Sequence, residues 1–164
     1  MIVPFNTLPN ESRVWIYQAN RELTETEIQE ISKKAEEFIA DWTRHGEDLK
    51  ASYEIKYDQF LVLAVDESFN DVSGCSIDSS VRFIKATEQS FGIDLMNKLS
   101  IAFKIGENIN TVSLADFQQY IKEEKINGDT IVFNNMVQSK ADYGTNWEVP
   151  ASQSWHQRFI PVIK

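Results

Sequence analysis

A chain of 164 residues with ordinary hydrophobic and charged fractions fits one globular domain, whose core needs no disulfide or metal to fold. Its 25 acidic and 16 basic residues give a formal charge of −9, which argues against nucleic acid and anionic membranes as partners. The single cysteine excludes an internal disulfide. No apolar run is long enough for a transmembrane helix and no signal-peptide pattern opens the chain, so we expect a cytoplasmic protein.

The first regular elements follow an irregular segment over residues 1–12. The β-branched and aromatic run 13–18 is typical of a strand. Residues 24–27 (TETE) form a capping box, which marks the start of a helix. The apolar residues that follow recur at helical spacing and are Ile28, Ile31, Ala35, Phe38, Ile39 and Trp42. This pattern predicts a long amphipathic helix over 25–44 that stops at Gly46.

The middle of the chain reads as two strands, a helix and a further strand. Residues 52–57 alternate between polar and apolar, and the continuously apolar run 60–65 indicates a central strand. After a polar loop, Ser76 or Asp78 caps a helix that ends at Gly92. Residues 99–105 alternate again. The order β-α-β-β-α-β predicts a ferredoxin-like core.

The remaining residues extend this core. The pattern predicts a short strand over 109–112, a helix from 113 to about 123 and a strand over 130–133. The arm 138–164 has little periodicity, and we expect turns and a short helix there. The sequence therefore predicts one α+β domain over 1–164, with an antiparallel or mixed sheet and helices on one of its faces.

Several segments carry a resemblance to a known family. They are VWIYQAN (14–20), GCSIDSSVRF (74–83), TIVFNN (130–135), WEVPA (147–151) and SWH (154–156). Together they resemble a family of short bacterial proteins that are commonly labelled "ABC transporter ATPase", and the resemblance extends over nearly the whole chain. The label implies nucleotide hydrolysis.

The residues that nucleotide hydrolysis requires are missing from the sequence. No segment matches the phosphate-binding pattern G-x-x-x-x-G-K-[ST], and the signature LSGGQ is absent. The apolar run that ends in Asp66 and Glu67 is similar to a Walker B strand, but any central strand that meets a polar loop has this form. Asp66, Glu67 and Asp71 lack the spacing of a calcium loop. We therefore reject ATP hydrolysis and predict neither a metal nor a cofactor.

Cys75 is the first candidate for chemistry, because a thiol at a helix start is favoured as thiolate by the helix dipole. An activated cysteine also needs a base, and the candidate is His156 in the tail. The alternative is that Cys75 is a small buried residue that packs the start of the helix. This second interpretation is the favoured one.

Further candidate binding residues are polar or aromatic. Asp78 and Arg82 have the i, i+4 spacing of a helical ion pair, which is either a surface contact or a grip for an anionic ligand. Asn134 and Asn135 follow a strand, where asparagines bind ligands or, more often, form turns.

The tail concentrates aromatic and charged residues. Trp155 and Arg158 belong to types that are enriched at binding hot spots. The alternative is an arm that packs its rings on the domain, which is slightly favoured.

The leading hypothesis is a non-enzymatic binding or adaptor domain. Its site for a protein or small-molecule partner is expected at the helix start 75–82 and the aromatic arm. The alternative is a cysteine-dependent enzyme or redox protein that uses Cys75 with His156 as base.

Overall fold

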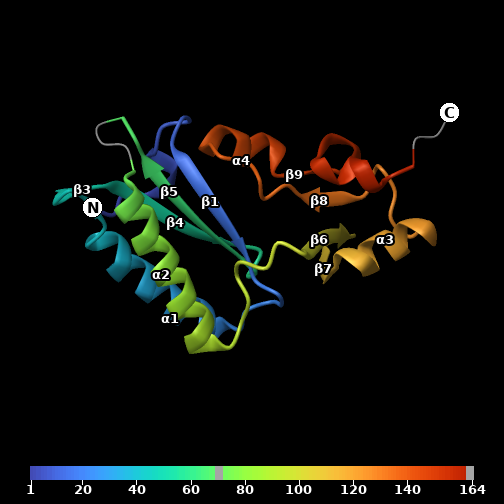
Figure 1. Ribbon diagram of the computed structural model, residues 1–164, viewed down its shortest axis with the longest axis horizontal. Helices are drawn as coiled ribbons and strands as arrows, with labels where there is room; N and C mark the ends of the chain where they lie inside the picture. Colours follow the sequence, from blue (N-terminus) through green and yellow to red (C-terminus); the bar gives the residue numbers. More distant parts are fainter. Residues whose placement is uncertain (69–71, 162–164) are drawn as a thin grey trace. The chain divides into compact units, whose positions relative to one another are not determined.

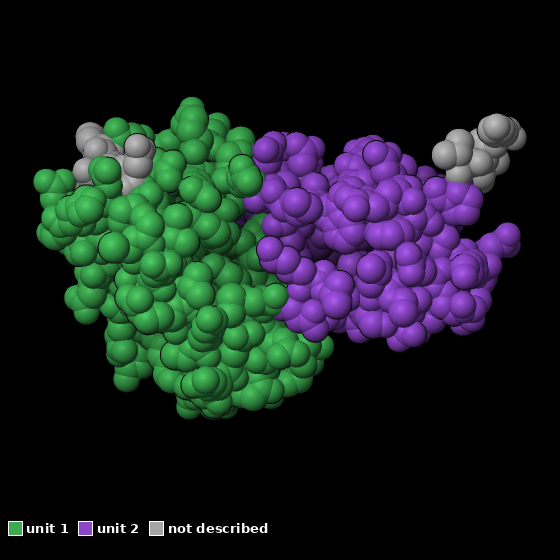
Figure 2. Space-filling model, in the orientation of Figure 1, with its two compact units in different colours: residues 1–96, 138–141 green, residues 97–137, 142–164 purple. Residues whose placement is uncertain are grey.

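The computed structural model describes residues 1–68 and 72–161 (Figure 1). They form two compact units, which are coloured separately in Figure 2. Unit 1 consists of Met1–Met96 and Gln138–Ala141, and unit 2 consists of Asn97–Val137 and the residues from Asp142 onward. The α+β class is confirmed, because both units combine antiparallel strands with helices.

A three-stranded antiparallel sheet forms the centre of unit 1. Its order is β1-β5-β4, with β1 at Arg13–Gln18, β5 at Phe60–Asp66 and β4 at Lys50–Lys56. Every residue of β5 is buried, as the continuously apolar run predicts for a central strand. Leu63 pairs with Trp15 of β1 and with Tyr53 of β4, so these three side chains share one face of the sheet.

Two long helices cover that face. In Figure 1, α1 (Glu25–Ala40) and α2 (Gly74–Phe91) lie in front of the sheet. Thr24 closes the predicted capping box with Glu27, and Gly92 ends α2 in the left-handed conformation. The buried side chains that join these helices to the sheet are Leu23, Ile31, Ile39, Leu61, Leu63, Val65 and Ile84.

The predicted end of the first helix is wrong. The helix stops at Ala40, and a small hairpin follows, in which β2 (Thr43–Arg44) pairs with β3 (Glu47–Asp48). His45 and Gly46 both have positive φ angles, 50° and 83°, which a two-residue hairpin turn requires. Gly46 therefore shapes a β-turn and does not cap a helix.

The ferredoxin-like topology is also wrong in its last strand. The predicted strand 99–105 is β6 (Ser100–Ile105), and it belongs to the sheet of unit 2. A short return segment of unit 1, residues 138–141, pairs with β1 instead. Val14 N–H donates to the carbonyl of Gln138 at 2.9 Å, and Lys140 N–H donates to the carbonyl of Ser12 at 2.8 Å. The edge of β1 is thus paired over a short length by residues far along the chain.

Unit 2 is built on a sheet of order β7-β6-β8-β9, in which all pairs are antiparallel. The extension follows the prediction, with β7 at Asn108–Ser113, α3 at Leu114–Lys122 and β8 at Ile131–Phe133. The arm holds α4 (Lys140–Asn146), β9 (Glu148–Pro150) and the 3-10 turns η2 (Ala151–Gln153) and η3 (Trp155–Phe159). None of the helices in the described ranges has the length and apolar character to cross a bilayer.

Candidate functional site

The start of α2 presents Cys75 to solvent. Ser73 is the N-cap, so the prediction of Ser76 or Asp78 as the cap is wrong, because the helix already begins at Gly74. The Ser73 hydroxyl accepts a hydrogen bond from Ser76 N–H at 3.1 Å. The β2 strand fixes this turn, because Ser76 Oγ donates to the carbonyl of Thr43 at 2.7 Å. Trp42 Nε1 donates in turn to the carbonyl of Ser76 at 2.9 Å. The helix start is therefore well anchored by Ser76, while Cys75 beside it is exposed. The favoured interpretation of Cys75 as a buried packing residue is wrong.

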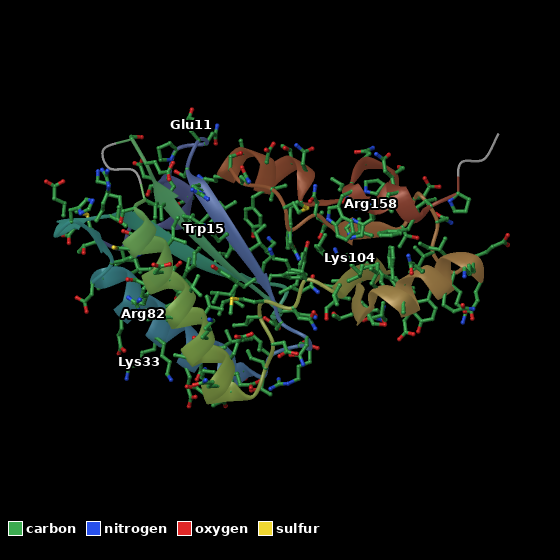
Figure 3. All side chains as sticks on the ribbon, viewed as in Figure 1. Glu11, Trp15, Lys33, Arg82, Lys104 and Arg158 are labelled. Atoms are coloured by element: carbon green, nitrogen blue, oxygen red, sulfur yellow. The ribbon has the colours of Figure 1, made fainter. Side chains whose placement is uncertain are left out.

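The predicted ion pair between Asp78 and Arg82 does not form. The Arg82 guanidinium (Figure 3) donates instead to Ser79 Oγ at 3.0 Å. Both Asp78 and Arg82 are exposed. Ser79 lies one turn before Arg82 and accepts this bond while donating to the carbonyl of Cys75 at 3.0 Å. Arg82 is on the surface of α2, and no carboxylate of the described residues holds it in an ion pair.

Asn134 and Asn135 stabilise a turn in unit 2. Asn134 Oδ1 accepts a hydrogen bond from Met136 N–H at 3.1 Å, as in an Asx turn. Asn135 Oδ1 accepts one from Trp147 Nε1 at 2.9 Å. Both amide oxygens thus bind groups of the protein itself, which agrees with the interpretation as a turn.

The aromatic tail packs on the core of unit 2. His156 is 1% exposed, and its ring lies 3.8 Å from the Trp155 ring and 5.7 Å from that of Phe117. The Ser154 hydroxyl and His156 Nδ1 share a hydrogen bond of 2.7 Å. Burial, with a smaller contribution from the Arg158 charge, lowers the pKa of His156 from 6.5 to about 4. The imidazole is therefore neutral at physiological pH and enclosed.

Arg158 has a local role in the same tail. Its Nε donates to the carbonyl of Trp155 at 3.3 Å, and its guanidinium lies over the rings of Trp155 and Phe159 at 5.6 and 5.8 Å (Figure 3). These cation–π contacts hold Arg158 along the tail.

The predicted site residues belong to two different units. Cys75, Asp78 and Arg82 are on α2 of unit 1, whereas Asn134, Asn135, Trp155, His156 and Arg158 are in unit 2. Each unit thus holds only one member of the predicted Cys75–His156 pair. Within residues 1–68 and 72–161 no group of three potential metal ligands comes together, and Asp71 lies outside the described residues.

Unit 1 contains a groove that the sequence did not indicate. It is open to solvent, has a volume of about 540 Å³ and runs between α1 and the outer edge of β4. Its lining is largely apolar and consists of Ile2, Val3, Pro4, Ile28, Ser32, Ser52, Tyr53 and Ile55. These residues come from three separate segments of the chain, so no local motif announces the groove. We call it the β4 groove.

Polar groups mark one side of the β4 groove. Tyr53 Oη donates to Glu36 Oε1 at 2.9 Å, so a carboxylate of α1 stands beside the lining. Partial burial raises the pKa of Tyr53, and a hydrogen bond with Ser32 opposes this shift. The tyrosine therefore stays protonated at neutral pH and acts as a hydrogen-bond donor toward the acidic side chain.

The net charge of the protein is concentrated in unit 1. Its 18 acidic and ten basic residues give a formal charge of −8, whereas the seven acidic and six basic residues of unit 2 give −1. The β4 groove therefore belongs to the strongly acidic part of the chain.

No family model matches the chain, and neither a curated protein nor a solved structure matches it. The resemblance of the sequence segments to the ATPase-labelled family stays a prediction.

Proposed function

We propose that the chain is a non-enzymatic binding domain and that unit 1 carries the site for its partner. The β4 groove is the observation that supports this proposal. Its apolar lining remains accessible, and Ile2 in that lining is 42% exposed. Apolar side chains that stay in contact with water gain free energy when a partner covers them, at roughly 25 cal/mol per Å².

The shape of the groove favours a polypeptide over a small molecule. Pockets for small molecules enclose most of their ligand's surface. The β4 groove is open to solvent and follows the edge of a strand, so it suits a chain segment that lies along it.

A peptide library displayed on phage tests the proposal. Peptides selected on the wild-type protein are measured again with Ile2→Glu, which puts a charge in the groove. We expect at least a tenfold loss of affinity. Leu99→Glu is the matched control, because Leu99 is also an exposed apolar residue but lies in unit 2. If every selected peptide binds both variants like the wild type, the β4 groove is not the partner site.

A cysteine-dependent activity is the second candidate function, because it requires a thiol that solvent reaches and Cys75 is exposed. The rate of alkylation of Cys75 against pH, with the denatured chain as reference, tests it. A midpoint well below the free-thiol value of about 8.5 supports an activated thiolate. A midpoint equal to that of the denatured chain contradicts it.

A further inference from the structure

We infer that the β4 groove binds an extended, basic polypeptide segment, which adds to the sheet of unit 1 as a further strand beside β4. This inference rests on the proposed binding function and names the class of its partner. It is carried by the backbone of β4, by the lining of the groove and by the charge of unit 1.

Among residues 1–68 and 72–161, the outer edge of β4 forms backbone hydrogen bonds only at its beginning. Val3 N–H donates to the carbonyl of Ala51 at 3.0 Å, and Ala51 N–H donates to the carbonyl of Met1 at 3.1 Å. This isolated bridge is parallel. Pro4, with φ −60° and ψ 137°, then leads the chain into the 3-10 turn η1 (Phe5–Thr7), so the pairing ends there.

The next outward-facing positions of β4 are Tyr53 and Ile55. Backbone groups of a strand alternate between its two neighbours, so these residues point to the same side as Ala51. In the described part of the chain, their outward N–H and C=O groups take no part in any backbone hydrogen bond outside the β4–β5 ladder. Such an edge is a template for another strand.

The β4 groove lies along this open edge. Ile28 of α1 stands on one side of it, and Ile2 and Val3 border the end where the bridge stops. Side chains of an added strand alternate between two directions, so every second one faces this lining. The backbone edge and the apolar lining thus act on the same segment: the edge binds its backbone and the groove its alternate side chains.

Charge selects a basic partner. Glu25 and Glu36 lie within one helical turn of Ile28 and Ser32 on the same side of α1. Cations near the groove include Lys33 on α1 (Figure 3), Lys50 and Lys56 of β4, of which Lys56 lies over the Tyr57 ring, and the N-terminal ammonium, which donates to the carbonyl of Leu49 at 2.7 Å. With all its lysines and arginines counted, unit 1 has a formal charge of −8, so it attracts a basic segment. The same charge repels a second copy of this chain.

Amide exchange of the full-length protein tests the inference directly. The probe is a synthetic nine-residue peptide in which valine alternates with threonine and two lysines stand at each end. We expect saturating peptide to slow exchange of the Tyr53 and Ile55 amides by about tenfold or more, because these N–H groups gain acceptors. The Glu54 amide, which faces β5, serves as the internal control. Unchanged exchange at Tyr53 and Ile55 with bound peptide contradicts strand addition.

Modified peptides separate the backbone from the side chains. Methylation of every second backbone nitrogen of the peptide removes the N–H donors along one of its two edges. Two such peptides are made, one for each alternate set of nitrogens. We expect one of them to bind at least tenfold more weakly than the unmodified peptide. If both methylated peptides bind with the affinity of the unmodified peptide, while the Ile2→Glu variant still binds more weakly than the wild type, strand addition is wrong and the proposed function stands. If Ile2→Glu has no effect on any peptide, both are wrong.

Charge is tested on both molecules. Replacing the lysines of the peptide by glutamates is expected to abolish measurable binding. Glu36→Gln is expected to weaken binding of the basic peptide two- to threefold, while Glu37→Gln, at an exposed position about 100° further round α1, leaves it unchanged. Equal binding of the acidic and basic peptides overturns the basic partner. A stable dimer of this chain in sedimentation, if Ile2→Glu dissociates it, also overturns the basic partner, because the β4 groove is then occupied by a second copy.

Discussion

The two units are built from similar elements but differ in the surfaces that they expose to solvent. In unit 1, two long helices cover one face of a three-stranded sheet, and apolar lining remains open beside β4. In unit 2, the short helix α3 packs on a four-stranded sheet, and the aromatic tail completes the core. The aromatic residues that composition marks as binding residues are thus used for packing, whereas the accessible groove is lined by residues that no motif identifies.

Deletion of a core side chain is expected to have the largest effect and tests whether the units are independent. Phe117 is fully buried and contacts the rings of Phe103 and His156. We expect Phe117→Ala to lower the free energy of unfolding by about 3–5 kcal/mol and Ile84→Ala in unit 1 by about 2–5 kcal/mol. Urea titrations followed by circular dichroism measure both.

The same variants test the prediction of one domain. If the chain is one cooperative domain, the whole protein unfolds in a single calorimetric transition, and each variant lowers the midpoint temperature of that transition. Two separate transitions, of which Phe117→Ala moves one and Ile84→Ala the other, would contradict that prediction and make the two units separate domains.

The buried histidine predicts that the stability of unit 2 depends on pH. Because the pKa of His156 falls from 6.5 unfolded to about 4 folded, the unfolded chain binds more protons between these values. Stability is therefore complete above pH 6.5 and falls as the pH drops toward 4, by at most about 3 kcal/mol.

Unfolding free energies measured from pH 7.5 to 4.5 check this. We expect His156→Gln to remove the part of the fall in unfolding free energy with decreasing pH that His156 causes. His45→Gln, at the exposed turn between β2 and β3, is expected to keep it. An unchanged slope in His156→Gln would show that other groups produce the pH dependence.

Helix caps are expected to give the smallest effects. Thr24 caps α1 through a complete capping box, whereas Ser113 caps α3 through the single bond from Asp116 N–H at 3.1 Å. We expect about 1 kcal/mol of destabilisation for Thr24→Ala, and less for Ser113→Ala. Thermal unfolding of the two variants measures the difference, and a larger effect of Ser113→Ala would contradict this ranking.

Local signals in the sequence predicted the elements better than their assembly. The capping box at Thr24 and the apolar run of β5 act over a few residues, and both elements form as expected. The alternation over residues 99–105 indicates which side chains share a face but not which sheet the strand joins. That choice depends on pairing with β7 and β8, which lie later in the chain.

The candidate site was less predictable for the same reason. The exposure of Cys75 and the burial of His156 depend on tertiary packing that a sequence pattern does not contain. The β4 groove brings together Ile2, Ile28 and Ile55 from three segments. Each of them alone resembles an ordinary core residue, and only the fold shows that they line an accessible surface.

The return segment 138–141 has a consequence for synthesis on the ribosome. The residues that pair with β1 emerge only after Asn97–Val137 have been made, which takes on the order of seconds at about 5–20 residues per second. Local strand pairing takes microseconds. The nascent chain thus carries β1 for a long interval without the neighbour that Gln138 and Lys140 later provide, and during that time the strand edge is open to other chains.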